Sequence, residues 1–303
     1  MNRREFLAAS LAATATYGRG IVPRTHTMDL PKYWIWTGGS PQSSDAELRT
    51  KYRKLRERGI QGVFLSQTEP REYDLVREEG LGLHVWMWTT NRGDEWIGKN
   101  HPEWYMVSRT GKSCHDQPPY VGYYKWISPA RPEVRAYIRD KALEIAVHPA
   151  VQGVHLDYVR YPDVILPKAL WKDYKLDQTE EMAEYDFCYS DATCKAFEAR
   201  YGRDPRKVEA PWADQDWIHF RQETVTTLVR EVCEAVRKEG KQTSAAVFPT
   251  PALARTICRQ DWDKWPLDVV APMIYDSFYE QPVSWIGDAV REDVQAVRFP
   301  VVA

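Results

Sequence analysis

Short apolar segments alternate with amphipathic segments along most of the chain, and this alternation restricts the folds that it can adopt. An alternating order of strands and helices indicates parallel strands joined by crossover helices. The predicted strands are Lys32–Thr37, Gln61–Ser66, Leu81–Thr89, Val151–Tyr158, Thr243–Phe248, Leu267–Ile274 and Phe299–Ala303. The predicted helices are Asp45–Arg58, Tyr73–Glu79, Pro132–Val147, Trp217–Glu239, Asp261–Trp265 and Ser284–Val297. The sequence therefore predicts an α/β fold.

Two long connections favour a barrel over a doubly wound sheet, which is the main alternative. They run from Thr90 to Pro129, after the third predicted strand, and from Pro162 to about Pro211, after the fourth. Active sites of (β/α)8 TIM barrels are built at these strand ends, so long insertions are expected there. The seventh predicted strand is the last. The prediction is thus a TIM barrel truncated before its eighth strand, which fits a fragment or a truncated reading frame.

The N-terminal residues have the order of an export signal. Arg3 and Arg4 precede Phe6 and Leu7, and an alanine-rich stretch then leads to Ala13-Thr14-Ala15. Paired arginines, a short apolar run and a small-residue cleavage site are typical of a twin-arginine-type signal peptide. The run is shorter than the roughly 20 residues of a membrane span. We predict a signal and linker over 1–30, a barrel domain over 31–303, no membrane span, and a periplasmic or secreted location.

The amino-acid composition restricts the classes of molecule that the protein is expected to bind. The net charge is −2 without a basic stripe, so nucleic acid is a poor candidate. The 13 Trp and 17 Tyr residues provide flat apolar faces with polar edges, which suit sugar rings but also serve core packing. A carbohydrate is the predicted partner.

The cysteines and short motifs suggest neither metal nor cofactor. Of the five cysteines, an odd number, Cys188 and Cys194 lie close enough in sequence for a disulfide, although buried free thiols are the commoner outcome. No paired metal-ligand spacing, phosphate-binding loop, nucleophile elbow or nucleotide fingerprint is present. We predict no metal and no cofactor.

Asp157 is the strongest candidate for a catalytic residue. It ends the apolar strand in the segment His155-Leu156-Asp157-Tyr158-Val159-Arg160-Tyr161-Pro162, where a barrel would place it at the rim of its active face. We expect Arg160 to hydrogen-bond the carboxylate and lower its pKa, keeping it ionised as a nucleophile. The alternative is a purely structural salt bridge between Asp157 and Arg160.

Hydrolysis of a carbohydrate would need a second carboxylate beside Asp157, and two acids at strand ends are candidates. Asp276 follows the sixth predicted strand beside Tyr275 and Phe278, where partial burial would raise its pKa as an acid catalyst requires. Glu69 follows the second predicted strand. Each is also explained as an exposed loop acid.

Aromatic and polar residues near the strand ends are candidates for sugar contacts. His155 shares a strand face with Asp157, although a core histidine is the commoner case, and the same holds for His84. The candidate substrate-binding residues are Trp86, Trp88, Trp104, Trp126, His155, Tyr158, Arg160, Tyr161 and Tyr275.

Several segments, in order, resemble the bacterial glycosyl-hydrolase-like family ten over about residues 30–303. They are the segment around Asp157, Asn100–Trp104, Thr110–Lys112, Ser128-Pro129, Pro132–Arg135, Asp186–Tyr189, Phe197–Pro205, Phe220-Arg221 and Ala271–Tyr275. The resemblance implies a barrel that hydrolyses a bacterial glycan, and members of the family have been linked to peptidoglycan strands. The chain departs from the family in lacking the end of the barrel.

Three functions fit these features. The first is a glycoside hydrolase with a two-carboxylate mechanism, and the second is a catalytically inactive barrel that binds glycans. The third, a sugar isomerase or lyase, lacks a visible set of metal ligands.

Overall fold

The structure, a computed structural model, describes residues 31–303, and the chain from Lys32 to Ala303 forms one compact unit. The predicted export signal, with Arg3 and Arg4, lies outside the described residues.

Six parallel strands form one sheet, and their order in space follows their order in the chain. The strands are β1 (Trp34–Thr37), β2 (Gly62–Ser66), β3 (Gly82–Trp88), β4 (Gly153–Asp157), β5 (Gln242–Val247) and β6 (Val269–Pro272). A doubly wound sheet would reverse its strand order at a switch point, and this sheet does not. The predicted parallel α/β fold is confirmed.

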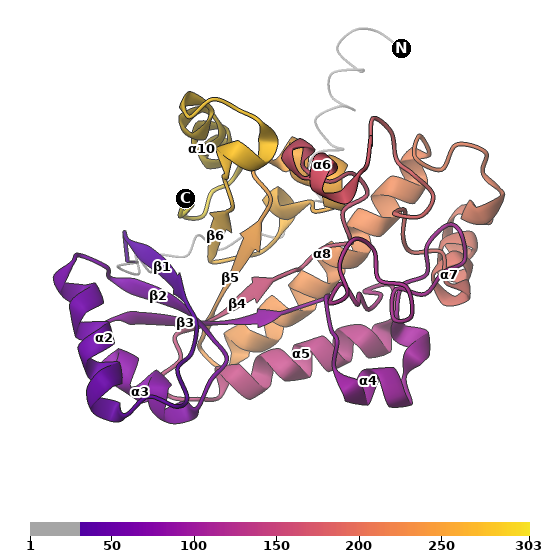
Figure 1. Ribbon diagram of the computed structural model, residues 1–303. Helices are drawn as coiled ribbons and strands as arrows, with labels where there is room; N and C mark the ends of the chain where they lie inside the picture. The colour runs from indigo at the N-terminus through magenta and orange to yellow at the C-terminus, as the bar shows by residue number, and fades with distance from the viewer. Residues whose placement is uncertain (1–30) are drawn as a thin grey trace, which may run out of the picture. The chain divides into compact units, whose positions relative to one another are not determined.

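Helices cover the outer face of the sheet and occupy the long connections (Figure 1). The α-helices are α2 (Asp45–Glu57), α3 (Pro70–Glu78), α4 (Glu95–Asn100), α5 (Pro132–Ala146), α6 (Trp171–Tyr174), α7 (Asp191–Tyr201), α8 (Gln215–Lys238), α9 (Pro251–Cys258) and α10 (Ser284–Ala296). The 3-10 helices are η1 (Pro102–Trp104), η2 (Lys168–Leu170), η3 (Pro205–Lys207), η4 (Trp262–Lys264) and η5 (Asp276–Tyr279). Figure 1 shows α5 and α8 side by side against the sheet, and both bury an apolar stripe.

The sheet is strongly curled. Neighbouring strands lie about 4.8 Å apart, so a flat sheet would separate β1 from β4 by roughly 14 Å. Yet the ring centroid of Trp36 on β1 lies 5.6 Å from that of His155 on β4. Phe64 on β2 stacks on the same imidazole at 4.1 Å. The inner face is therefore concave, as in part of a barrel.

The C-terminal segment differs from its prediction. Phe299–Ala303 does not form a strand, but Val301 makes an isolated parallel bridge to Val270 of β6. The amide of Val270 donates to the Pro300 carbonyl at 3.0 Å, and the Val302 amide donates to the Val270 carbonyl at 2.9 Å. The outer edge of β6 is thus used for parallel pairing, but over a single residue pair.

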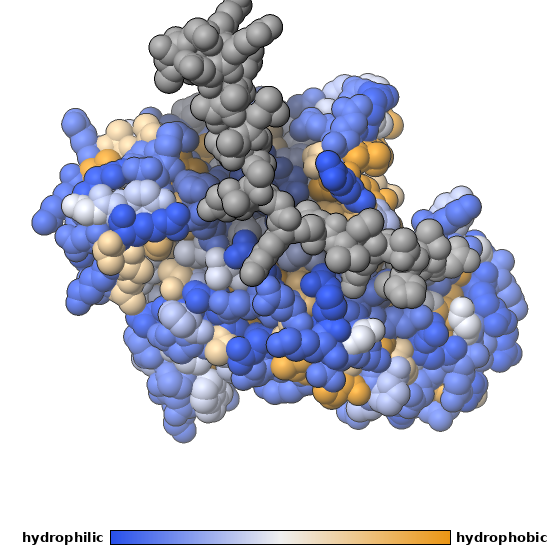
Figure 2. Space-filling model, turned by 180° about the vertical axis from the view of Figure 1, so that it is seen from behind, coloured by the Kyte–Doolittle hydropathy of each residue, from blue (hydrophilic) through white to orange (hydrophobic). Residues whose placement is uncertain are grey.

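All five cysteines are buried free thiols, so the suggested disulfide between Cys188 and Cys194 is absent. In the described part of the chain, no helix combines the length and the apolar character that crossing a bilayer would need. Figure 2 shows a largely hydrophilic face on which hydrophobic residues gather over α10. Val283, just before α10, and Val294 within it are exposed.

Candidate active site

A cavity of about 190 Å³ opens at the carboxyl ends of β4, β5 and β6. Its wall is mostly aromatic and aliphatic, and two carboxylates and one guanidinium interrupt it. The lining residues are Tyr124, Asp157, Tyr158, Arg160, Asp163, Leu166, Pro167, Leu170, Phe248, Met273, Tyr275, Phe278 and Tyr279. We call this the Asp157 cavity. Few polar groups in an apolar wall are typical of small-molecule sites.

Asp157 is half-buried at the end of β4 and lines this cavity. One carboxylate oxygen accepts a hydrogen bond from the Tyr158 amide at 2.7 Å. Burial raises the pKa of Asp157 above its ordinary value, against the opposing effects of that amide and of the Arg160 charge. The prediction of a lowered pKa was wrong, because the loss of solvent outweighs the nearby positive charge.

Arg160 binds a different carboxylate from the one expected. Its Nη1 atom donates to Asp163 at 3.0 Å and to the Tyr161 carbonyl at 2.9 Å. The guanidinium lies 4.8 Å from the ring centroids of both Trp126 and Phe248. Arg160 is therefore held in a buried aromatic cage by Asp163, which the sequence analysis did not single out.

Tyr158 has a left-handed backbone with a φ of 50°. A non-glycine residue rarely adopts this conformation, and the surrounding structure must stabilise it. Here the Thr90 amide and hydroxyl both donate to the Tyr158 carbonyl. This conformation directs the chain away from β4 immediately after Asp157, and strained residues of this kind concentrate at functional sites.

Below Asp157, the inner face of the sheet carries a buried polar network. The Oγ atom of Ser244 lies 2.7 Å from Nδ1 of His84 and 2.7 Å from Nδ1 of His155. Nε2 of His84 lies 2.9 Å from Oε1 of Gln242. Gly153 makes room for this network, since a Cβ atom there would lie 2.6 Å from the His84 ring. We call Phe64, His84, His155, Gln242 and Ser244 the floor.

The hydrogen bonds define the tautomers of both histidines. Gln242 Oε1 can only accept, so His84 carries its proton on Nε2 and accepts at Nδ1 from the Ser244 hydroxyl. Ser244 then accepts from a protonated Nδ1 of His155. Burial lowers the pKa of His84 to about 4 and that of His155 well below its ordinary value. Both rings are neutral and buried, and this burial disfavours the predicted contact of His155 with substrate.

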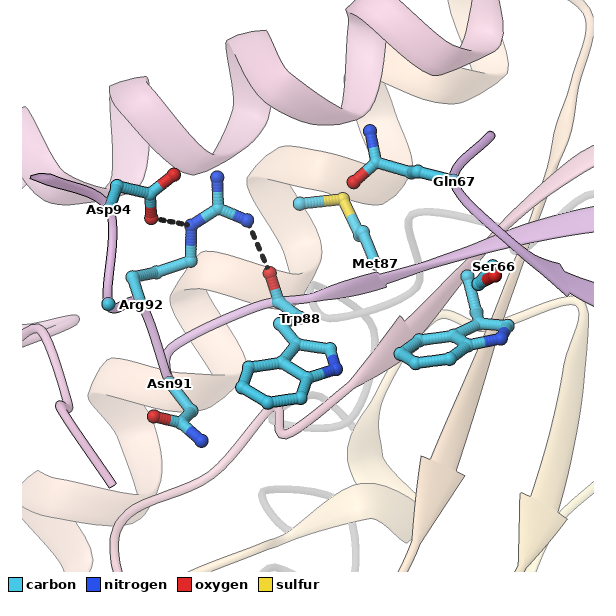
Figure 3. Close-up of a pocket in the computed structure, with 9 residues that line it drawn as sticks. Ser66, Gln67, Met87, Trp88, Asn91, Arg92 and Asp94 are labelled. Carbon is cyan, nitrogen blue, oxygen red and sulfur yellow. Dashed lines mark hydrogen bonds and ion pairs between the residues drawn. The ribbon is translucent and has the colours of Figure 1, made fainter. Parts of the chain in front are cut away.

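A second cavity, of about 430 Å³, lies at the carboxyl ends of β2 and β3 and includes Trp86 and Trp88 in its lining. Figure 3 shows the Trp88 indole on the opposite side of β3 from Met87. Trp88 pairs in register with Asp157, so both side chains share the concave face. The Arg92 guanidinium is fixed at 2.8 Å from the Trp88 carbonyl and 2.9 Å from Asp94 (Figure 3).

Three of the proposed sugar contacts are packing residues instead. Trp126 and Tyr161 are fully buried, and the Tyr161 hydroxyl lies 3.0 Å from the Thr224 hydroxyl. Trp104 is 6% exposed and stacks on His101 at 4.2 Å. Of the aromatic residues proposed as sugar contacts, Trp86, Trp88, Tyr158 and Tyr275 line the two cavities.

The two candidate partner acids do not line the Asp157 cavity. Asp276 is half-buried at the start of η5, between Tyr275 and Phe278, which do line it. Glu69 is exposed at the N-cap of α3 and makes no side-chain capping bond. The carboxylate that shares the cavity with Asp157 is Asp163, and only the turn after Tyr161 brings it there.

One further buried acid lies on α10, away from these cavities. Asp293 is fully buried, and apart from the backbone of Thr250 its carboxylate has no hydrogen-bond partner among the described residues. Burial raises its pKa to about 7. Over residues 31–303, no cluster of three or more His, Cys, Asp or Glu side chains is arranged to hold a metal ion.

The curled parallel sheet, with an acid at the end of β4, has the architecture of part of an α/β barrel. The chain is similar to the PgaB (BpsB) glycoside hydrolase domain from Bordetella bronchiseptica, with a TM-score of 0.62 and 11% identity over 89% of this chain and 84% of that one. The catalytic domain of β-amylase from Paenibacillus polymyxa gives a TM-score of 0.56 and 12% identity over 89% and 85%. At these identities the likeness shows the fold alone.

The chain belongs to the family whose model is described as "Putative glycosyl hydrolase domain", which matches residues 90–298. This match confirms the resemblance to a glycosyl-hydrolase-like family. A β-galactosidase from the psychrophilic Marinomonas ef1 has a TM-score of 0.56 and 15% identity over 80% of this chain. The chain spans only 40% of the length of that enzyme. No curated protein matches the chain.

Proposed function

We propose that the protein is a glycoside hydrolase that cleaves a bacterial glycan, with Asp157 as its general acid. The observation that carries this proposal is the half-buried Asp157 carboxyl group in an aromatic cavity, with a pKa raised by burial. A general acid must hold its proton near the working pH and still reach the leaving-group oxygen. We further propose that the six strands belong to an eight-stranded barrel.

Asp276 is the proposed partner carboxylate, acting as nucleophile or base. It follows Tyr275, whose ring lines the cavity and is close enough to Asp157 for that charge to raise the tyrosine pKa. Catalytic contacts often tighten only once substrate is bound. Asp276 therefore remains a candidate although it does not line the cavity. Asp163 is the alternative partner because it already lies in the cavity, and Glu69 is the third candidate.

Hydrolysis of purified peptidoglycan glycan strands and of aryl glycosides tests the proposal with the full-length chain. Asp157→Asn should abolish cleavage of the natural glycan but spare aryl glycosides whose leaving group needs no proton. Partner variants Asp276→Asn, Asp163→Asn and Glu69→Gln should lose both activities if they remove the nucleophile or base. Normal glycan cleavage by Asp157→Asn would refute its catalytic role.

One observation favours a second candidate, a glycan-binding protein without catalysis. Of the two carboxylates in the cavity, Asp163 is bound to Arg160, so Asp157 is the only acid there outside an ion pair among the described residues. A single available acid can hydrogen-bond a sugar without cleaving it. In that case wild type and Asp157→Phe should differ in glycan affinity, and neither should release reducing ends.

We also propose export by the twin-arginine-type signal of residues 1–30. Its support is the order of Arg3, Arg4, the apolar run and Ala13-Thr14-Ala15. Cell fractionation of the full chain should place a shortened protein outside the cytoplasm. With lysine in place of both Arg3 and Arg4, the uncleaved chain should remain in the cytoplasm. Unchanged export of that variant would contradict the assignment.

A further inference from the structure

Exposed aromatic rings lie on both sides of Asp157. On the β3 side, Trp88 is half-buried and contacts Tyr123 at 5.8 Å between ring centroids. On the β6 side, Tyr275 contacts Phe278 at 5.7 Å. Tyr123, Tyr275 and Phe278 are 51%, 52% and 41% exposed, although their apolar faces would favour burial.

The strand order places Trp88 and Tyr275 on opposite flanks of Asp157. Asp157 ends β4, Trp88 ends the neighbouring β3, and Tyr275 follows β6 two strands away in the other direction. Tyr158 connects them, since its ring lies 5.0 Å from that of Trp88 and also lines the cavity that contains Tyr275.

The β3 flank continues along the concave face. Trp86 lies two residues before Trp88 on the same face of β3, and the 41% exposed Trp36 follows on β1, where its ring contacts Phe64. The Asp157 cavity on the other flank is smaller than the roughly 300 Å³ of ordinary ligand sites, which suits a single ring.

We infer that Asp157 acts between two aromatic binding surfaces, and that the substrate is a glycan chain long enough to occupy both. The bond that is cleaved is then internal to the chain. This inference rests on the proposed glycosidase function and adds the length of the substrate and the position of the cut. Trp88 and Tyr123 hold sugars on one side of the scissile bond, and Tyr275 and Phe278 hold them on the other.

A size ladder of reducing-end-labelled oligosaccharides from peptidoglycan glycan strands tests the position of the cut. Wild type should release labelled products of several lengths from the earliest times. Its kcat/KM should rise at least about tenfold from the shortest to the longest cleaved oligomer, as each occupied aromatic surface adds binding. Release of single terminal units at a rate independent of length would overturn the inference.

Two alanine variants and one matched control test the surfaces. Trp88→Ala and Phe278→Ala should each lower kcat/KM about tenfold for long oligomers and move the preferred cut in opposite directions. Trp212→Ala is the control, because Trp212 is 42% exposed but packs on Arg109 outside both cavities. Equal behaviour of Trp88→Ala and Trp212→Ala would refute the β3 surface.

Binding separates this inference from the proposed function. The affinity of Asp157→Asn for the same ladder is measured by calorimetry, alone and combined with Trp88→Ala or Phe278→Ala. Suppose that wild type cleaves nothing, but that affinity rises with oligomer length and falls in both combined variants. This result would support the two binding surfaces and refute only the proposed hydrolysis. Absence of binding, or binding independent of length, refutes the surfaces.

Discussion

His155 and Asp157 lie two residues apart on the same face of β4, yet their side chains have different surroundings. His155 belongs to the buried floor, and Asp157 lines the cavity above it. Burial favours the neutral form of both, lowering the pKa of His155 and raising that of Asp157. His155 is packed under Phe64 and Trp36 and bonded to Ser244. Asp157 is in contact with a cavity.

The difference shows that access, and not burial alone, separates a structural group from a candidate catalytic one. A neutral carboxyl group at a cavity wall can donate a proton to a ligand, whereas a neutral imidazole within a closed network cannot reach one. The predictions below change one region and expect the other to be unaffected.

Asp157→Asn should give the largest effect, a loss of about 10²- to 10⁴-fold in kcat/KM for the natural glycan, since general acid catalysis contributes at this order. The wild-type rate should fall as pH rises through the raised pKa of Asp157, because the acid is then deprotonated. Steady-state kinetics from pH 4 to 9 would show that limb in wild type. Asp116→Asn, at an exposed acid, is the control.

A stable Asp157→Asn protein is required for this comparison. Thermal unfolding should show no loss of stability, because a neutral amide replaces a carboxylate whose charge is disfavoured by burial. A large drop in Tm would mean that Asp157 belongs to the structural core.

Acid should destabilise the protein between pH 6.5 and pH 4, the range between the ordinary pKa of His84 and its folded value of about 4. His84 alone contributes roughly 3 kcal/mol to this loss, and His155 adds to it. The folded state binds fewer protons than the unfolded state there, so stability is present above pH 6.5 and is lost as pH falls. Urea unfolding measures it in the Asp293→Asn background, since Asp293 acts in the opposite direction. Constant stability over this range would exclude a buried neutral His84.

Gly153→Ala should cost about 2 kcal/mol of unfolding free energy, because a new Cβ would displace the His84 ring from Gln242 and Ser244. Gly122→Ala is the matched control, since nothing lies within 4 Å of a Cβ there. Per folded molecule, hydrolysis should change little. Equal stability of the two variants would show that the floor adapts to the added methyl group.

Asp293→Asn should give the smallest effect, a net gain of about 1 to 2 kcal/mol at pH 8 and little at pH 4. Removing the charge gains roughly 4 kcal/mol at pH 8, but the buried amide that replaces it offsets much of this gain. The folded pKa of about 7 exceeds the unfolded value, so Asp293 destabilises the fold progressively as pH rises from about 4 to 7. Denaturation curves at both pH values measure it. A loss of stability at pH 8 would show that Asp293 has a stabilising partner.

The sequence predicted what depends on periodicity and missed what depends on turns. Asp157 was placed correctly at a strand end because an acid closes an apolar run, and the shared face of His155 followed from alternation. The partner of Arg160 was missed because Asp163 reaches it only through the turn after Tyr161.

Long connections explain the other errors. Trp126 and Tyr105 are in segments that pair by isolated bridges with Asn91 and Ile127, and periodicity does not reveal such pairing. Trp126 was therefore proposed as a sugar contact but is buried. The short α9 was also missed, because its eight residues are too few to show a helical period.

The reactivity of the five buried thiols reports local unfolding of the protein. Burial raises the pKa of Cys114, Cys233 and Cys258 to about 12, so they carry almost no reactive thiolate in the closed protein. A thiol-specific reagent would consequently label a molecule only while part of it is unfolded. The rate of labelling at each cysteine would map which parts of the fold open first, without any engineered probe.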